Sequence, residues 1–114
     1  MSTITTHILD TSQGKPATGV HVALEMQNAD ETWRLVSAGV TDDGGRLKFV
    51  FPPGFVLAKG AYRLVFETSA YFRAQNSEGL YPTVTIHFAV RDPAQHFHLP
   101  LLLAPHGYST YRGS

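Results

Sequence analysis

Hydrophobic and polar residues alternate along most of this chain with a period of two. In GVHVALEM, for example, Val20, Val22 and Leu24 fall on one side, and His21 and Ala23 fall on the other. Strict alternation of this kind is typical of antiparallel strands that bury one face and expose the other. It predicts eight strands, at about residues 4–10, 20–27, 32–39, 46–51, 61–68, 83–90, 96–103 and 106–112.

Turn-forming residues separate these segments. Glycine, proline and aspartate cluster in QGKPATG at 13–19, DDGG at 42–45, PPG at 52–54 and RDP at 91–93. Such residues favour tight turns because they fix or free the backbone dihedrals. Short strands at near-regular spacing with turns between them predict an all-β sandwich or barrel.

One stretch, SAYFRAQNSEG, breaks the alternation and predicts a short helix. Ser69 is expected to be its N-cap, and Gly79 is expected to end it. Tyr71 and Phe72 are expected to pack inward from this helix.

Composition narrows the functional classes. A chain of 114 residues is expected to form one domain, residues 1–114. It has no cysteine, which excludes disulfides, thiolate catalysis and zinc–cysteine or iron–sulfur sites. Nine basic and nine acidic residues cancel, so no basic field is available for nucleic acid or an anionic membrane, and self-association is mildly favoured.

The N-terminal segment and the lengths of the apolar runs bear on localisation. MSTITTHILD has neither a basic start nor an apolar stretch of signal-peptide length. The longest apolar runs, such as LLLA, are too short to span a bilayer. We therefore expect a soluble, cytoplasmic protein.

Two of the predicted strands carry polar residues that a plain sandwich does not require. In TTHILD, His7 shares a face with Thr5 and Leu9. In DDGGRLKF, Arg46 opens the strand after the turn and points away from the face of Leu47. Each residue taken alone is accounted for by solvent exposure at a strand surface. An arginine also offers a rigid donor fork for carboxylate, phosphate or carbonyl oxygens.

The third such stretch is HFHLPLLLAPHGYSTYRGS. Here His96 and His98 fall on one face, and Pro100 then interrupts the hydrogen-bond ladder, which is typical of a sheet edge or a bulge. Alternation resumes over residues 106–112, so the C-terminus itself is predicted to be a strand paired with its predecessor as a hairpin.

Two catalytic alternatives arise from these residues. A histidine pair at i, i+2 suggests a metal site, but only His7 and His106 remain as further ligands and no acid follows the pair. A serine nucleophile at Ser109 would lack the glycine elbow that such nucleophiles need. Neither alternative is favoured, and we expect no metal or other cofactor.

Taken together, the three stretches resemble the transthyretin-related 5-hydroxyisourate hydrolase family. THILDTSQGKPATGV resembles the opening strand and turn of the family, and TDDGGRL resembles its arginine-bearing turn. HFHLPLLLAPHGYSTYRGS resembles its closing block, and the terminal YRGS is the signature that separates these enzymes from transthyretin proper. The resemblance covers essentially the whole chain.

The resemblance implies a transthyretin-like (prealbumin-like) sandwich of two four-stranded sheets with one short helix. It also implies a homotetramer whose active sites lie at the interface between dimers. His7, Arg46 and His98 are the implied catalytic residues, and His96 is treated as outside the site. The implied substrate-binding residues are His7, Arg46, Tyr111, Arg112, Gly113 and Ser114.

The implied reaction is hydrolysis of a cyclic amide of 5-hydroxyisourate. His7 and His98 would orient and deprotonate a water, because histidine titrates near neutrality. Arg46 would bind the carbonyl oxygen and stabilise its developing charge. Ser114 would bind substrate N–H groups or hold a histidine tautomer, and Tyr111 would form a wall of the pocket. Gly113 would allow a close approach of the chain end.

Two other interpretations remain. A non-enzymatic transthyretin-like tetramer could hold a small aromatic ligand in the same channel, although such a channel favours a more apolar lining. A sandwich that serves only as an interaction module would explain the alternation, but it would leave the paired histidines and the YRGS terminus unexplained.

Overall fold

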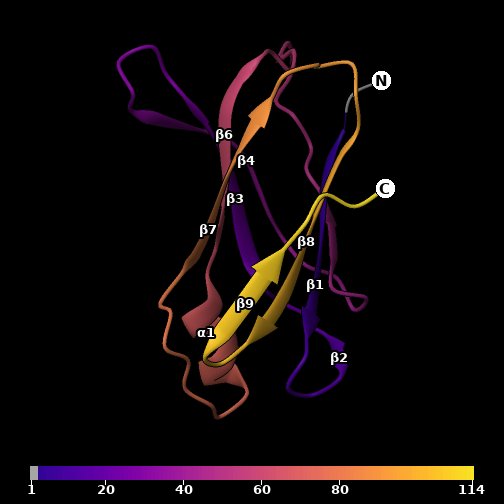
Figure 1. The fold of residues 1–114 in the computed structure, drawn as a ribbon, viewed down its shortest axis with the longest axis vertical. Helices are drawn as coiled ribbons and strands as arrows, with labels where there is room; N and C mark the ends of the chain where they lie inside the picture. The colour runs from indigo at the N-terminus through magenta and orange to yellow at the C-terminus, as the bar shows by residue number, and fades with distance from the viewer. Residues whose placement is uncertain (1–2) are drawn as a thin grey trace.

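The computed structural model describes residues 3–114; Met1 and Ser2, where the expected domain begins, lie outside the described residues. It confirms a mostly-β sandwich of two sheets with one short helix (Figure 1). The described residues form nine strand segments rather than eight. In chain order the elements are β1 (Ile4–Asp10), β2 (Lys15–Pro16), β3 (His21–Gln27), β4 (Trp33–Val40), β5 (Arg46–Lys48), β6 (Gly60–Phe66), α1 (Thr68–Ala74), β7 (Val84–Val90), β8 (Phe97–Ala104) and β9 (Gly107–Thr110).

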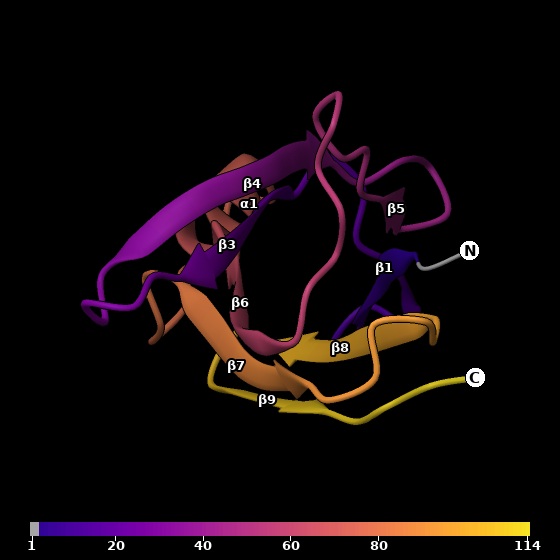
Figure 2. The same ribbon diagram turned by 90° about the horizontal axis from the view of Figure 1, so that it is seen from above.

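The two sheets face each other across the core (Figure 2). The first has the order β2-β1-β8-β9, with β5 also paired to β1, and the second has the order β4-β3-β6-β7. All pairs are antiparallel except β1 and β8, which run parallel with Thr5 opposite His98. The first strand of the chain and the penultimate one, β1 and β8, therefore lie side by side at the middle of the first sheet.

The alternation seen in the sequence places the core correctly. Strand β1 alternates strictly between buried and half-buried residues, with Ile4 and Ile8 fully buried and His7 facing outward with Thr5. In β6, Tyr62, Leu64 and Phe66 are completely buried against the facing sheet. Removing this much apolar surface from water is the main term that stabilises such a sandwich.

The strand predicted over 46–51 is shorter than expected, because regular pairing with β1 stops before Phe49. β5 ends at Lys48, and the Phe49 N–H then makes a single bond of 3.1 Å to the Ile4 carbonyl. The Val50 carbonyl accepts a 2.7 Å bond from the hydroxyl of Ser37, which belongs to β4 of the second sheet. The small strand β2 was not predicted, because its two residues lie within a segment that has the composition of a turn.

The helix is confirmed, but its expected limits are wrong. It begins after Glu67 and ends at Ala74, so Ser69 lies in its first turn and Gly79 lies beyond it. No side chain caps the start; instead the Ser69 N–H donates to the Pro82 carbonyl at 3.1 Å. Gly79 has a packing role, because a Cβ there would stand 2.8 Å from the Phe72 ring. Tyr71 and Phe72 are buried as predicted.

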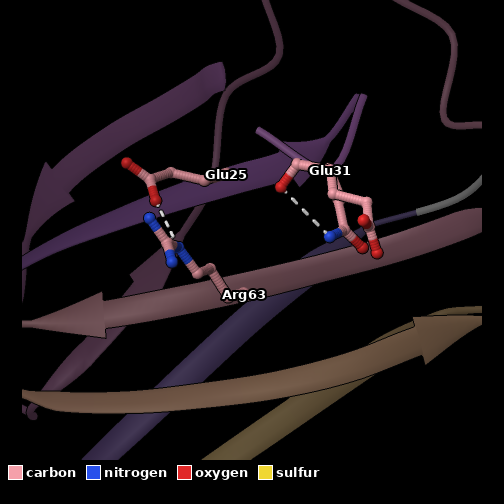
Figure 3. A network of polar contacts seen from close by, with 4 residues as sticks. Glu25, Glu31 and Arg63 are labelled. Atoms are coloured by element: carbon pink, nitrogen blue, oxygen red, sulfur yellow. Dashed lines mark hydrogen bonds and ion pairs between the residues drawn. The ribbon is translucent and has the colours of Figure 1, made fainter. Parts of the chain in front are cut away.

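The outer face of the second sheet carries a small polar network. Arg63 of β6 pairs with Glu25 of β3 at 2.5 Å (Figure 3). The Arg63 guanidinium also lies 4.3 Å from the Trp33 ring centroid, and that ring meets His87 edge-on. Figure 3 also shows Glu31, in the turn before β4, whose carbonyl accepts a bond from the side chain of Gln27. Half-exposed pairs of this kind contribute up to about 1 kcal/mol each.

Among residues 3–114, no helix is both long enough and apolar enough to cross a membrane.

Candidate active site

The turn at 42–45 fixes Arg46 beside β1. Its Asp42 carboxylate accepts bonds from the Gly44 and Arg46 N–H groups at 2.9 and 3.0 Å. Gly45 has φ +73°, and a Cβ there would stand 2.4 Å from the Ile8 carbonyl oxygen, so only glycine fits without strain. The result is a register that places Arg46 directly opposite His7.

The parallel pairing of β1 with β8 brings His98 to the same surface. Thr5 of β1 lies opposite His98 in the ladder, and the Thr5 hydroxyl meets His98 Nδ1 at 2.8 Å. Thr5 also lies opposite Lys48 of β5 on its other side. Three strands that are distant in sequence therefore present the outward side chains of Thr5, Arg46, Lys48 and His98 together.

Pro100 shapes the path of the C-terminal segment. The expectation that Pro100 lies at a sheet edge or bulge is wrong, because β8 is flanked by β1 and β9. Pro100 does interrupt the hydrogen-bond ladder between β8 and β9. The two strands pair only as far as Thr110, and pairing resumes as a single bridge between His98 and Gly113. The missing N–H of proline explains the gap, and the Thr110 hydroxyl donates to the Pro100 carbonyl at 2.7 Å.

Gly113 holds the chain end against His98. Its N–H donates to the His98 carbonyl at 2.8 Å, and a Cβ there would stand only 2.5 Å from His98 Cδ2. The segment then continues to Ser114 on the side of the molecule where β1 and β5 lie (Figure 2). The absence of a side chain at residue 113 is therefore what allows this close approach.

Arg112 fastens the same segment from outside. Its guanidinium donates to the Gln95 side chain and to the His96 carbonyl, both at 3.0 Å. It also lies 4.6 Å from the centroid of the Phe97 ring. The Arg112 guanidinium thus bonds to residues of the same chain.

These elements surround a hollow of about 300 Å³. Its wall combines two fixed cations, two imidazoles and hydroxyl groups with apolar surface that includes Leu47. The lining residues are Thr5, Thr6, Arg46, Leu47, Lys48, His96, His98 and Ser114.

The position of His98 favours its neutral form. Its pKa is lowered first by partial burial, which disfavours the charged imidazolium, and then by the positive charges of His96, Arg46 and His7. A histidine with a lowered pKa keeps a free lone pair down to a lower pH. His98 is therefore better suited to accept a proton near neutral pH than a histidine without these neighbours.

The hollow brings together part of the site expected from the sequence. Arg46, His98 and Ser114 line it directly, and His7 lies next to Arg46 across the ladder. Gly113 supports it through His98, whereas the Tyr111 side chain is not among its lining residues and is 56% exposed.

The expected site left out residues that the structure places in the same wall. They are Thr5, Thr6, Leu47, Lys48 and His96, the last of which was expected to lie outside the site. The strand period contained a signal for three of them, since Thr5 shares a face with His7, Lys48 shares one with Arg46, and His96 shares one with His98. What the period could not show was that these faces adjoin.

Other histidines lie elsewhere. His106 borders a different hollow with Glu78, Gly79 and Leu80. Over residues 3–114, no three His, Cys, Asp or Glu side chains gather closely enough to hold a metal ion. A water held near His98 and Arg46 would meet a proton acceptor and a fixed cation, the pair of groups that hydrolysis of a carbonyl compound requires.

The sandwich with β1 and β8 parallel at the middle of one sheet, and a polar hollow beside them, defines a transthyretin-like protein. The model of the HIUase/Transthyretin family matches residues 4–113, and the chain belongs to this family.

Proteins similar to this chain include 5-hydroxyisourate hydrolases and a transthyretin. The 5-hydroxyisourate hydrolase of Caulobacter vibrioides is 45% identical over 118 residues, with both chains covered completely. The structure of the Klebsiella pneumoniae 5-hydroxyisourate hydrolase is 42% identical with a TM-score of 0.83, covering 98% of this chain and 99% of its own. Sea bream transthyretin, solved in complex with thyroxine, is 31% identical with a TM-score of 0.87, covering 96% of this chain and 93% of its own.

Proposed function

We propose that the protein is a 5-hydroxyisourate hydrolase acting in urate degradation. The observation that carries this proposal is the hollow that His98, Arg46 and the C-terminal Ser114 line together. Relatives named for this activity are 42–46% identical over nearly the whole chain. The product would be 2-oxo-4-hydroxy-4-carboxy-5-ureidoimidazoline.

The proposed chemistry uses water and no cofactor. His98, assisted by His7, accepts a proton from a water whose oxygen adds to the carbonyl carbon of the cyclic amide. Arg46 donates hydrogen bonds to the carbonyl oxygen as negative charge develops there. The C–N bond then breaks, the proton passes from the imidazole to the leaving nitrogen, and the carboxylic acid that remains releases its own proton to solvent to give the carboxylate.

The C-terminal residues complete the pocket in this proposal. Ser114 lies in the wall of the hollow, where its hydroxyl and carboxylate can accept bonds from substrate N–H groups. Tyr111 would cover the flat heterocycle from the side that is open to solvent in the single chain. Arg112, which is bound to Gln95 and the His96 carbonyl, acts in the proposed site by fixing this segment.

The proposed assembly is a homotetramer in which the hollow faces another copy across the interface between dimers. A hollow with one open side needs such a cover if water is to be excluded during the reaction.

The test generates 5-hydroxyisourate in situ with urate oxidase and follows its ultraviolet decay with and without the protein. We expect acceleration by the parent and losses of about 10²–10⁴-fold in His98→Ala, the scale of positioned proton transfer. Arg46→Ala should lose about 10²–10³-fold, the scale of a lost oxyanion donor.

Matched controls are His106→Ala and Arg91→Ala, which remove the same residue types outside the hollow. Both should keep the parent rate. A decay no faster than the spontaneous one would reject the hydrolase. Parent activity in His98→Ala or Arg46→Ala would reject the assignment of these residues.

The alternative is a non-enzymatic carrier of a small aromatic ligand, which the likeness to sea bream transthyretin supports. The charged lining of Arg46 and Lys48 is the feature that favours the enzyme over this alternative. Saturable binding of an aromatic ligand without any acceleration of the decay would favour the carrier.

A further inference from the structure

His96 and His98 are held by two equivalent contacts. The Thr3 hydroxyl bonds to His96 Nδ1, and the Thr5 hydroxyl bonds to His98 Nδ1 two residues further along the same parallel register. The two imidazole rings lie nearly parallel, at 10°, with their centroids 6.3 Å apart. Thr3 and Thr5, two residues apart, thus hold His96 and His98, also two residues apart, in one orientation.

The backbone of His96 is also fixed. Its carbonyl accepts a 3.0 Å bond from the Arg112 guanidinium, which packs on the ring of the next residue, Phe97. The His96 side chain is therefore held by Thr3, and its main chain is held by Arg112. Such a held geometry is unusual for an exposed side chain, which normally samples several rotamers.

In both rings the hydroxyl occupies Nδ1, and Nε2 is left as the other ring nitrogen. Only one of the two rings needs to act as a base in the proposed hydrolysis. The partner ring can then act through its charge, because two imidazolium ions at this separation in a partly buried site repel each other.

We propose that His96 is a positioning residue of the hydrolase site, whose ring lies alongside that of His98 and, when protonated, disfavours a second positive charge on His98. This inference rests on the proposed function for its catalytic meaning. The effect of His96 on His98 itself does not depend on which substrate is used.

The charged groups around His98 agree with this role. Arg46 and Lys48 face the hollow from β5, His7 lies on β1, and Ser114 brings its carboxylate from the C-terminal segment. Among the charges that lower the pKa of His98, that of His96 comes first, ahead of Arg46 and His7.

The test compares two substitutions with opposite charge effects. His96→Asn keeps a polar atom near Thr3 and removes the charge, so the pKa of His98 should rise and the acid limb of kcat/KM should move to higher pH. His96→Arg keeps a positive charge at every pH, so the acid limb should stay at the parent position or move lower.

A second readout needs no substrate. Proton NMR titration of the His98 ring, assigned by its loss in His98→Gln, gives its pKa directly in each variant. His87→Asn, on the outer face of the second sheet, is the matched control and should leave His98 unchanged. An unchanged His98 pKa in His96→Asn would overturn the inference, whatever the activity. Failure to accelerate the decay of 5-hydroxyisourate would reject the proposed function, and the titration would still decide the role of His96.

Discussion

Gly113 shows how one residue without a side chain supports the chemistry of another. The atoms around it leave no room: a Cβ would stand 2.5 Å from His98 Cδ2 and 3.3 Å from Pro100 Cγ. The backbone bond from Gly113 to the His98 carbonyl lies at the same point. Any side chain at residue 113 must therefore move the terminal segment, the His98 ring, or both.

We predict that Gly113→Ala lowers kcat/KM by about 10²-fold, the effect of misplacing reacting groups by roughly 1 Å. Stability should change little, because the segment near the chain end buries few apolar contacts. Steady-state kinetics together with thermal unfolding would measure both quantities. Gly107→Ala is the control, since a Cβ there has nothing within 4 Å. Equal activity of the two variants would contradict the proposed close fit.

Asp10 links three elements at the end of β1. This carboxylate is fully buried and accepts bonds from the N–H and hydroxyl of Ser12, from Gln13, and from the Tyr71 hydroxyl of α1 at 2.7 Å. Burial alone would raise the pKa of Asp10, but the bonds from Ser12, Tyr71 and Gln13 together outweigh it and lower the pKa. Asp10 thus ties the strand to the following turn and to the helix.

The lowered pKa gives the sign of a pH dependence. The ionised Asp10 stabilises the fold at pH values above its unfolded pKa of about 3.9, and this contribution is lost as the pH falls through the lower folded pKa. We predict that Asp10→Asn costs about 1–3 kcal/mol of unfolding free energy at neutral pH, the scale of a lost charged hydrogen bond. The difference from the parent should shrink in acid.

Urea unfolding of both proteins from neutral pH downward would measure this difference. Asp43→Asn is the control, since Asp43 is an exposed residue of the 42–45 turn. A constant difference across the whole pH range would show that the charge of Asp10 does not stabilise the fold.

At the scale of elements, much of the fold could be predicted from the residues. The period of two identified eight of the nine strand segments in residues 3–114 and the faces that they bury. The ends of elements were less predictable, because tertiary contacts set them. Beyond the end of β5 at Lys48, the Ser37 hydroxyl donates a hydrogen bond to the Val50 carbonyl. At the start of the helix, the Pro82 carbonyl accepts a hydrogen bond from a backbone N–H that no side chain caps. Neither partner is near in sequence.

At the scale of the whole molecule, the site could not be predicted from periodicity, because periodicity gives faces and not neighbours. The residues bring no local reason for β1 to pair in parallel with β8, yet this pairing puts Thr5 beside His98. The family resemblance supplied the grouping of His7, Arg46 and His98. It did not supply His96 or Lys48, which enter the hollow only through the register of the sheet.

Assembly is the property of the whole molecule on which the proposed site depends most. In the single chain Tyr111 is 56% exposed and Tyr108 is 43% exposed, and β9 and β7 each form one edge of their sheet. Edge strands with free backbone groups and large exposed apolar side chains are typical of surfaces that associate. A second copy over the hollow would also exclude water from His98 and Arg46.

We predict that sedimentation velocity detects a species of four copies of the 12.5 kDa chain. Kinetics over the same dilution series should show activity per chain falling wherever smaller species appear, because each hollow then loses its cover. His98→Ala, which alters the interior of the hollow rather than an edge strand, should sediment like the parent and so separate assembly from chemistry. A monomer with full activity on 5-hydroxyisourate would show that one chain carries a complete site, and the role given to the facing copy would then be wrong.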